Sequence, residues 1–360
     1  MTKKISATAI ILLAFINGVF AQDSTKTLTI SGGVDAYYRY NFSGKYPNNY
    51  TSFTNSQSSF ELGMASIRAD ASALDGKVTA TVDLGFGRRA EEFSYNDGTT
   101  DQNKNGFVSL SNLKQLYVTY APSSKVKFTF GKFGTHVGYE LVDAQLNRNY
   151  SMSYMFTNGP FFHTGLKADF TAGPVGFMIG VTNYTDQSSS TTNVKSVIAQ
   201  LSGGTSNGKL KAYLNYVGSY GSNSLAIPGD LKSLSQIDLV VNAILSSKFN
   251  IGFNGTIQSR KNGIDIESGS WKGAALYLNA DPSDKLGITL RSELISDSKL
   301  IYFSTKNIFA NTLSFNFKVG PLTIIPELRA ESAKSEIFLK GDGTDTKSTF
   351  SALLAVVYKF

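Results

Sequence analysis

The sequence has 360 residues with 34 basic and 27 acidic side chains, and it contains no cysteine, two histidines and one tryptophan. The lack of cysteine excludes disulfide bonds and thiolate metal sites, and two histidines leave few groups for demanding catalysis. A pI of about 9.2 raises nucleic acid as a partner. However, lysine and arginine are scattered singly along the chain and form no basic stripe, so we expect no nucleic-acid partner.

The first 21 residues have the features of a secretory signal peptide. Lys3 and Lys4 precede the apolar run AIILLAFINGVF, which ends in a V-x-A cleavage site at Ala21. The run is shorter than the roughly 20 residues that a helical membrane span needs. Removal of residues 1–21 from 360 leaves 339, and the net charge falls from +7 to +5 because the segment carries two lysines and no acid.

The rest of the chain alternates apolar with polar residues, a period of two that indicates β-strands. About sixteen such segments can be counted, and many are close to the ~9–11 residues that a tilted strand needs to cross a bilayer. Residues 58–72 change parity near Met64 and Ala65, which indicates a β-bulge. Residues 193–204 alternate poorly, so we expect sixteen strands to within about two.

A mean hydropathy of -0.10 resembles that of a water-soluble protein. A membrane barrel gives the same value, because lipid-facing and lumen-facing residues alternate and average out. The chain contains 18 tyrosines and 25 phenylalanines, which suits the aromatic girdles of a barrel at the two membrane interfaces.

The connections between the strands alternate strictly between short and long. The short ones are rich in Gly, Pro, Asp and Ser and are typical of tight turns: 74–77, 121–125, 171–174, 203–209, 246–248, 281–284 and 319–321. The long ones are polar: 42–58, 88–106, 134–160, 186–192, 218–233, 259–270, 299–307 and 333–348. Outer-membrane barrels sort their loops in this way, whereas Greek-key sandwiches do not.

We therefore predict an all-β fold, a transmembrane antiparallel β-barrel of about sixteen strands with short periplasmic turns and long extracellular loops. Residues 22–360 are expected to form a single barrel domain. An even number of strands lets the last strand pair with the first, which leaves no open sheet edge.

The face opposite the apolar one carries charges of both signs, which in a barrel would border a water-filled lumen. Our pore-lining candidates are Arg39, Asp83, Lys127, Lys211, Arg291, Glu293, Glu327 and Arg329. The alternative is the solvated face of a soluble β protein. Mixed signs argue against strong ion selectivity, and a net charge of +5 favours anions weakly.

Residues 131–165 differ from the other connections in their length and in their aromatic and charged content. They contain G-K-F at Gly131, then G-Y-E followed by D-A, then Y-S-M-S-Y from Tyr150, and finally G-P-F-F-H-T-G up to Gly165. This group of motifs resembles the OmpL-like beta-barrel porins of Gram-negative bacteria. The resemblance implies a diffusion channel of the outer membrane and supplies no binding residues.

We expect residues 134–160 to fold inward and to narrow the lumen, with Glu140, Asp143 and Arg148 facing basic residues of the wall. Opposed charges would order water and would slow apolar solutes. The constriction candidates are Tyr139, Glu140, Asp143, Arg148, Tyr150 and Tyr154. Alternatively, this loop covers the barrel mouth and constricts nothing.

Three other sites were considered. His136 or His163 with Ser151 or Ser153 would suit an outer-membrane hydrolase of the phospholipase type, but no acidic third member or strained nucleophile turn accompanies them. Zinc lacks ligands. The glycines of GFGRR lack the strand-to-helix context of a phosphate-binding loop.

A weak calcium motif begins with Asp101, Asn103 and Asn105, but Asn112 occupies the twelfth position, where a bidentate glutamate belongs. We therefore predict no cofactor and no metal. An unchanged melting temperature in chelator would remove calcium from consideration.

The chain ends in TFSALLAVVYKF, whose alternate residues from Phe350 to Phe360 are apolar. Tyr358 and Phe360 resemble the C-terminal signal that the barrel-assembly machinery reads. We expect a passive porin for small polar solutes, embedded in outer-membrane lipid, with a homotrimer as one possible assembly. The competing interpretations are the hydrolase and a β-rich surface adhesin or scaffold.

Overall fold

The computed structural model describes residues 26–95, 108–190, 193–220, 231–262, 268–300 and 302–360. The predicted signal peptide and the calcium candidates Asp101, Asn103 and Asn105 lie outside these residues. No described helix is long and apolar enough to cross a membrane.

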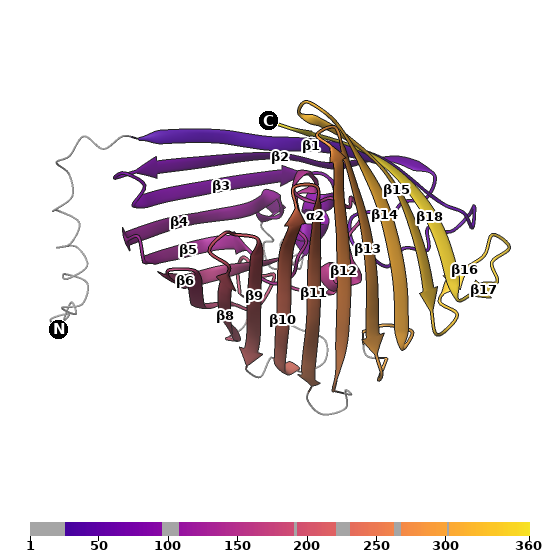
Figure 1. Ribbon diagram of the computed structural model, residues 1–360. Helices are drawn as coiled ribbons and strands as arrows, with labels where there is room; N and C mark the ends of the chain where they lie inside the picture. Colours follow the sequence, from indigo (N-terminus) through magenta and orange to yellow (C-terminus); the bar gives the residue numbers. More distant parts are fainter. Residues whose placement is uncertain (1–25, 96–107, 191–192, 221–230, 263–267, 301) are drawn as a thin grey trace.

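Sixteen antiparallel strands form one closed barrel, which confirms the predicted fold (Figure 1). Each strand pairs with its neighbours along the chain, and β1 pairs with β18 to close the sheet. The strands are β1 (Thr27–Asn41), β2 (Ser59–Ala73), β3 (Val78–Phe86), β4 (Leu113–Ser123), β5 (Val126–Gly134), β6 (Phe162–Ala172), β7 (Val175–Asn183), β8 (Lys195–Gly204), β9 (Leu210–Tyr220), β10 (Leu231–Ser246), β11 (Phe249–Asn262), β12 (Gly269–Ser283), β13 (Leu286–Asp297), β14 (Asn307–Val319), β15 (Leu322–Ala333) and β18 (Ser348–Lys359).

The remaining elements are short and lie in the connections. They are α2 (Arg88–Phe93), η1 (Val108–Asn112), η2 (Ala144–Leu146), α4 (Tyr154–Asn158) and the two-stranded sheet of β16 (Phe338–Leu339) and β17 (Asp345–Thr346). The β16–β17 pair lies between β15 and β18, in a connection that we expected to be a polar loop. Its Leu339 exchanges hydrogen bonds of 2.8 and 2.9 Å with Asn48 of the β1–β2 loop.

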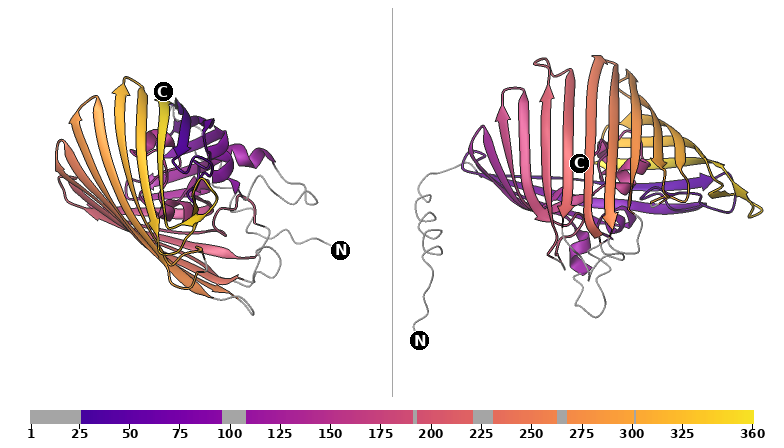
Figure 2. Two further views of the ribbon diagram at one scale, coloured as in Figure 1. Left: turned by 90° about the vertical axis from the view of Figure 1, so that its right-hand side faces the viewer. Right: turned by 90° about the horizontal axis from the view of Figure 1, so that it is seen from below.

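The two faces of the wall differ as the alternation predicts. Large apolar side chains are exposed on the outer face, which suits contact with lipid. On β18, Phe350, Leu354, Val356 and Tyr358 are exposed, whereas the intervening Leu353 is buried on the inner face. Figure 2 shows from two further directions how the strands curve around the enclosed part of the chain.

The turns and loops follow the predicted order, with a tight turn at one end of each strand pair and a long connection at the other. Residues 195–204 form β8 despite their poor alternation. The bulge in β2 lies at Gly63, one residue before the expected pair, because Asp35 pairs with Met64 and Ala36 pairs with Leu62.

The C-terminal residue completes the closing pair of strands. The backbone of Phe360 exchanges hydrogen bonds of 3.0 and 3.1 Å with Gly32 of β1. A Cβ atom on Gly32 would lie 2.7 Å from the Phe360 ring and 2.2 Å from the carbonyl oxygen of Ser66. Glycine at this position therefore lets the terminal ring lie against β1.

We expect deletion of Phe360 to lower the amount of folded protein in the outer membrane severalfold, because it removes the Gly32 hydrogen bonds and the ring that lies against β1. Heat-modifiable migration in gels of membrane fractions measures the folded protein. Phe360→Tyr keeps the ring and serves as the control. Normal insertion of the deletion variant would contradict the prediction.

Candidate functional site: the barrel lumen

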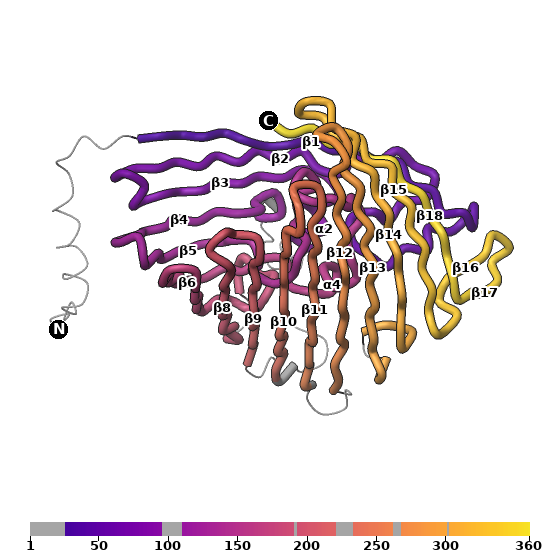
Figure 3. The backbone as a smooth tube through the Cα atoms, in the orientation of Figure 1, coloured from indigo at the N-terminus to yellow at the C-terminus, as the bar shows by residue number. Residues whose placement is uncertain are grey.

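Residues 134–160, which include nearly all of the connection from β5 to β6, lie inside the barrel; we call them the lumen loop (Figure 3). Its contacts reach strands far apart around the wall. The Gly138 amide donates to Asp238 on β10 at 3.0 Å. Near the other end of the loop, the Tyr150 hydroxyl donates to Asp35 on β1 at 2.5 Å. The loop therefore spans the lumen from one wall to another.

The local structure of the lumen loop follows from its sequence. Ser153 begins α4 as an N-cap residue, since its hydroxyl accepts a hydrogen bond from the Phe156 amide at 3.1 Å. The Ser153 amide in turn donates to Glu140 at 2.7 Å, which ties the two ends of the loop together. Tyr139 stacks on Tyr277 of β12 with ring centroids 4.0 Å apart.

Two arginines of the wall bind backbone carbonyls of the lumen loop. Arg291 on β13 donates to the carbonyl oxygens of Ser151 at 2.7 Å and Met152 at 3.2 Å, and it forms an ion pair with Glu140. Arg329 on β15 donates to the same Met152 carbonyl at 3.1 Å. These groups satisfy backbone acceptors that have no strand partner.

Two glutamates of the wall bind backbone amides of the same loop. Glu327 accepts from the Tyr150 amide at 2.9 Å and from the Ser151 amide at 3.3 Å. Glu293 accepts from the Tyr154 amide at 2.8 Å. Four of the pore-lining candidates therefore face the lumen, but they contact the lumen loop and not water. Each is at most 3% exposed: Arg291, Glu293, Glu327 and Arg329.

Of the other two charged candidates in the lumen loop, Asp143 faces a basic residue of the wall as expected, whereas Arg148 does not. Asp143 accepts from Lys114 at 2.6 Å, and Lys114 also donates to Asp83 at 3.0 Å. Arg148, expected to face basic residues, instead binds the carboxylate of Asp281 at 3.0 and 3.1 Å. That expectation was wrong for Arg148, because a guanidinium in this position is stabilised by a carboxylate.

Lys114 is a lumen residue that the sequence analysis missed. It is the second residue of β4, directly after the long β3–β4 connection, and its side chain is 1% exposed. Parity offered no signal for it, since the adjacent Gln115 pairs with the inward Asp83 and the register shifts between Asp83 and Leu84.

Three further pore-lining candidates lie elsewhere on the wall. Arg39 donates to the carbonyl oxygens of Pro47 and Ser56 in the β1–β2 loop. Lys127 on β5 has a half-exposed side chain 3.9 Å from Asp169. Lys211 is exposed on β9 beside the β8–β9 turn.

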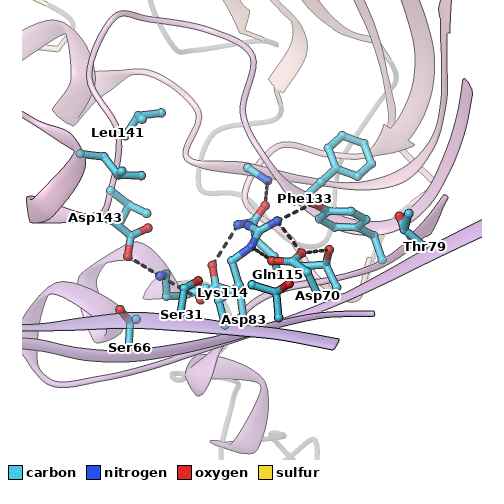
Figure 4. Close-up of a pocket in the computed structure, with 18 of the residues that line it drawn as sticks. Ser31, Ser66, Asp70, Thr79, Asp83, Lys114, Gln115, Phe133, Leu141 and Asp143 are labelled. Carbon is cyan, nitrogen blue, oxygen red and sulfur yellow. Dashed lines mark hydrogen bonds and ion pairs between the residues drawn. The ribbon is translucent and has the colours of Figure 1, made fainter. Parts of the chain in front are cut away.

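A cavity of about 1000 Å³ lies between strands β1 to β6 and the lumen loop (Figure 4). Hydroxyl groups line much of it, and the Arg68 guanidinium is held there by Asp70 at 2.7 Å. Lys127 and Lys167 are its other basic residues on β5 and β6. In Figure 4, Asp143 and Lys114 point toward each other at one side of this cavity.

Ionisation in the lumen loop is shifted by burial. Burial raises the pKa of the Tyr150 and Tyr154 phenols well above the usual range, and neighbouring carboxylates act in the same direction. Both phenols are therefore neutral donors at ordinary pH; Tyr154 donates to Glu331 at 2.6 Å. Burial lowers the pKa of His136 to about 4, so its ring is neutral.

The histidines do not meet the serines of the hydrolase alternative. The His163 ring contacts the Thr135 hydroxyl at 3.2 Å, and the His136 ring contacts the Tyr216 carbonyl oxygen at 3.1 Å. Ser153 is occupied as the helix cap, and the Ser151 hydroxyl accepts from Arg291 at 3.4 Å. Among the described residues, no group of three His, Cys, Asp or Glu side chains is arranged to hold a metal ion.

The model of one family, described as "Putative beta-barrel porin-2, OmpL-like", matches residues 27–360. The chain belongs to this family. It is an integral β-barrel of the outer membrane and a porin for passive diffusion. No curated protein matches it.

Solved structures share the fold of this porin at low identity. The outer membrane channel DcaP of Acinetobacter baumannii is 12% identical, with a TM-score of 0.63 over 95% of this chain and 99% of that one. The anion-selective porin from Comamonas acidovorans is 12% identical, with a TM-score of 0.61 over 93% and 100%. OmpT of Vibrio cholerae in its trimer form is 12% identical, with a TM-score of 0.60 over 93% and 100%.

We expect Glu140→Ala to destabilise the porin by about 3–5 kcal/mol, because it leaves the buried Arg291 guanidinium without this carboxylate. Lys127→Ala is the control, since its half-exposed pair with Asp169 is worth about 0–1 kcal/mol. Urea unfolding in lipid vesicles measures both changes. Equal unfolding midpoints for the two variants would contradict the prediction.

Proposed function

We propose that this porin admits small hydrophilic solutes through a lumen that the inward-folded loop narrows. The observation that carries the proposal is the attachment of residues 138–150 to β10 at one end and to β1 across the barrel at the other, which leaves a cavity of about 1000 Å³ beside strands β1 to β6. Solutes would move along this cavity down their own concentration gradient. The hydroxyls and paired charges of the lining replace part of the hydration of a polar solute.

The charged lining of the cavity supports size-limited rather than strongly charge-selective passage. Arg68 is neutralised by Asp70, and the lysines Lys127 and Lys167 share the single carboxylate Asp169. Lys127 and Lys167 together exceed Asp169 by one positive charge, which supports a weak preference for anions. The fold relative from Comamonas acidovorans is described as anion-selective.

We further propose that permeation involves no chemical step and no bound cofactor. The separation of the histidines from Ser151 and Ser153 supports this, and no contact among the described residues favours a hydrolase. Outer-membrane lipid and the barrel-assembly machinery are the proposed partners. A homotrimer is proposed by analogy with the trimer form of the OmpT fold relative.

Removal of residues 141–149 is expected to raise single-channel conductance severalfold, because it deletes η2 and the residues of the lumen loop on either side of it while keeping all sixteen strands. Planar-bilayer recordings of purified, heat-modifiable protein measure the effect. Unchanged conductance in a folded variant would mean that the loop does not narrow the passage.

Lys127→Glu with Lys167→Glu is expected to move the reversal potential in a salt gradient toward the cation value, because both side chains line the main cavity. The shift should shrink at high ionic strength, where charges are screened. Lys211→Glu is a matched control on the same inner face but outside that lining. Equal shifts from the control and the double variant would place the passage elsewhere.

A further inference from the structure

The segment GFGRR, whose glycines suit no phosphate site, forms the junction between β3 and the short helix α2. Gly87 has a φ of 112°, a left-handed value that favours glycine, and it precedes the first turn of α2. A Cβ atom there would lie 2.7 Å from the carbonyl oxygen of Gly63. The sharp bend turns the second arginine of the segment, Arg89, toward the lumen loop.

Arg89 has no exposed surface, and it contacts the lumen loop at two places, Val142 and Tyr150, which we call the two legs of the loop. Its guanidinium donates to the carbonyl oxygen of Val142 at 3.2 Å and to that of Tyr150 at 3.2 Å. These two carbonyls flank η2 and the charged residues Asp143 and Arg148. One side chain from the β3–β4 connection therefore joins the two ends of the 142–150 segment.

Two aromatic rings fix the plane of this guanidinium. The rings of Phe53 and Tyr150 each lie with their centroid 4.8 Å from Arg89 Cζ. Such contacts are favourable when the cation is desolvated. Phe53 itself has a φ of 76°, an unusual value for a non-glycine residue, and its amide donates to Glu92 of α2 at 2.7 Å.

The wall leaves room for this arrangement at the β2 bulge. A Cβ atom on Gly63 would lie 1.7 Å from the Asp35 carboxylate and 2.6 Å from the Tyr150 hydroxyl. The carboxylate that receives the Tyr150 hydroxyl thus occupies the space that a side chain at position 63 would fill. The bend at Gly87 directs Arg89 toward the loop, the bulge at Gly63 makes room for Tyr150, and the rings of Phe53 and Tyr150 lie against the Arg89 guanidinium.

We propose that Arg89 is a clamp: a positioning residue that holds the two legs of the lumen loop together and so sets the width of the passage. That Arg89 sets the width of the passage rests on the proposed function, whereas its holding of the loop does not. Without the guanidinium, the Val142 and Tyr150 carbonyls lose their shared donor, and the 142–150 segment can separate from α2. Arg89 is not proposed to contact solutes.

The test uses the natural absence of cysteine from the chain. Ser151→Cys places a nearly isosteric thiol next to Tyr150, at a position that is 4% exposed. Leu141→Cys places a thiol at a position on the same loop that is 48% exposed and reports whether the reagent reaches the lumen. The probe is a charged methanethiosulfonate added to the full-length protein in lipid vesicles.

Arg89→Ala is expected to increase the modification rate of the cysteine at position 151 at least tenfold, while that at position 141 stays unchanged. The matched control is Arg88→Ala, because this neighbour in α2 is partly exposed and instead pairs with Glu61 at 3.0 Å. A rate for Arg89→Ala within twofold of the parent would overturn the clamp. So would an equal increase with Arg88→Ala.

Arg89→Lys keeps the experiment decisive if Arg89→Ala does not reach the folded, heat-modifiable form. A lysine keeps the charge but cannot bridge the two carbonyls as a planar guanidinium does, so a smaller, severalfold increase is expected, and no increase overturns the clamp. Single-channel conductance of the same proteins separates the two halves of the proposal. Faster modification with unchanged conductance supports the clamp and overturns the narrowing of the passage by the loop.

Discussion

The backbone of the lumen loop must find hydrogen-bond partners inside a barrel whose strands are already fully paired with one another. Closure of β1 on β18 leaves no free sheet edge, so the donors and acceptors must come from side chains of the wall. Arg291 and Arg329 supply the donors, and Glu293 and Glu327 supply the acceptors. This exchange between wall side chains and loop backbone fixes where the loop lies and therefore where space remains.

The same constraint explains why the inner wall is not uniformly polar. Loop residues such as Ala144 and Tyr150 pack against Ile325 and Leu353 on the inner faces of β15 and β18. Water is excluded along this contact, while the cavity remains beside β1 to β6. The apolar residues on both faces of the last strand thus serve two contacts, with lipid outside and with the loop inside.

Sequence alternation was sufficient to predict the barrel, its strand number and the order of turns and loops, because lipid on one side and a lumen on the other impose a period of two. Parity also placed Arg291 and Glu327 on the inner face. It could not show that the loop covers them, since parity says which face a side chain lies on and nothing about what lies opposite. The partners of Arg148 and Lys114 depended on where the lumen loop meets the wall, which no local pattern encodes.

The contacts also explain why a short motif can identify a family whose fold tolerates great sequence change. A wall strand needs only alternation, and fold relatives 12% identical to this chain keep the barrel. Several motif residues of the lumen loop have a particular partner on the wall instead: Glu140 pairs with Arg291, Tyr150 with Asp35, and Tyr154 with Glu331. A change in one of these loop residues leaves a buried polar group on the wall without its partner, at a cost comparable to a large part of a protein's stability. Loop and inner wall are therefore expected to change together, whereas the outer face is constrained only to remain apolar.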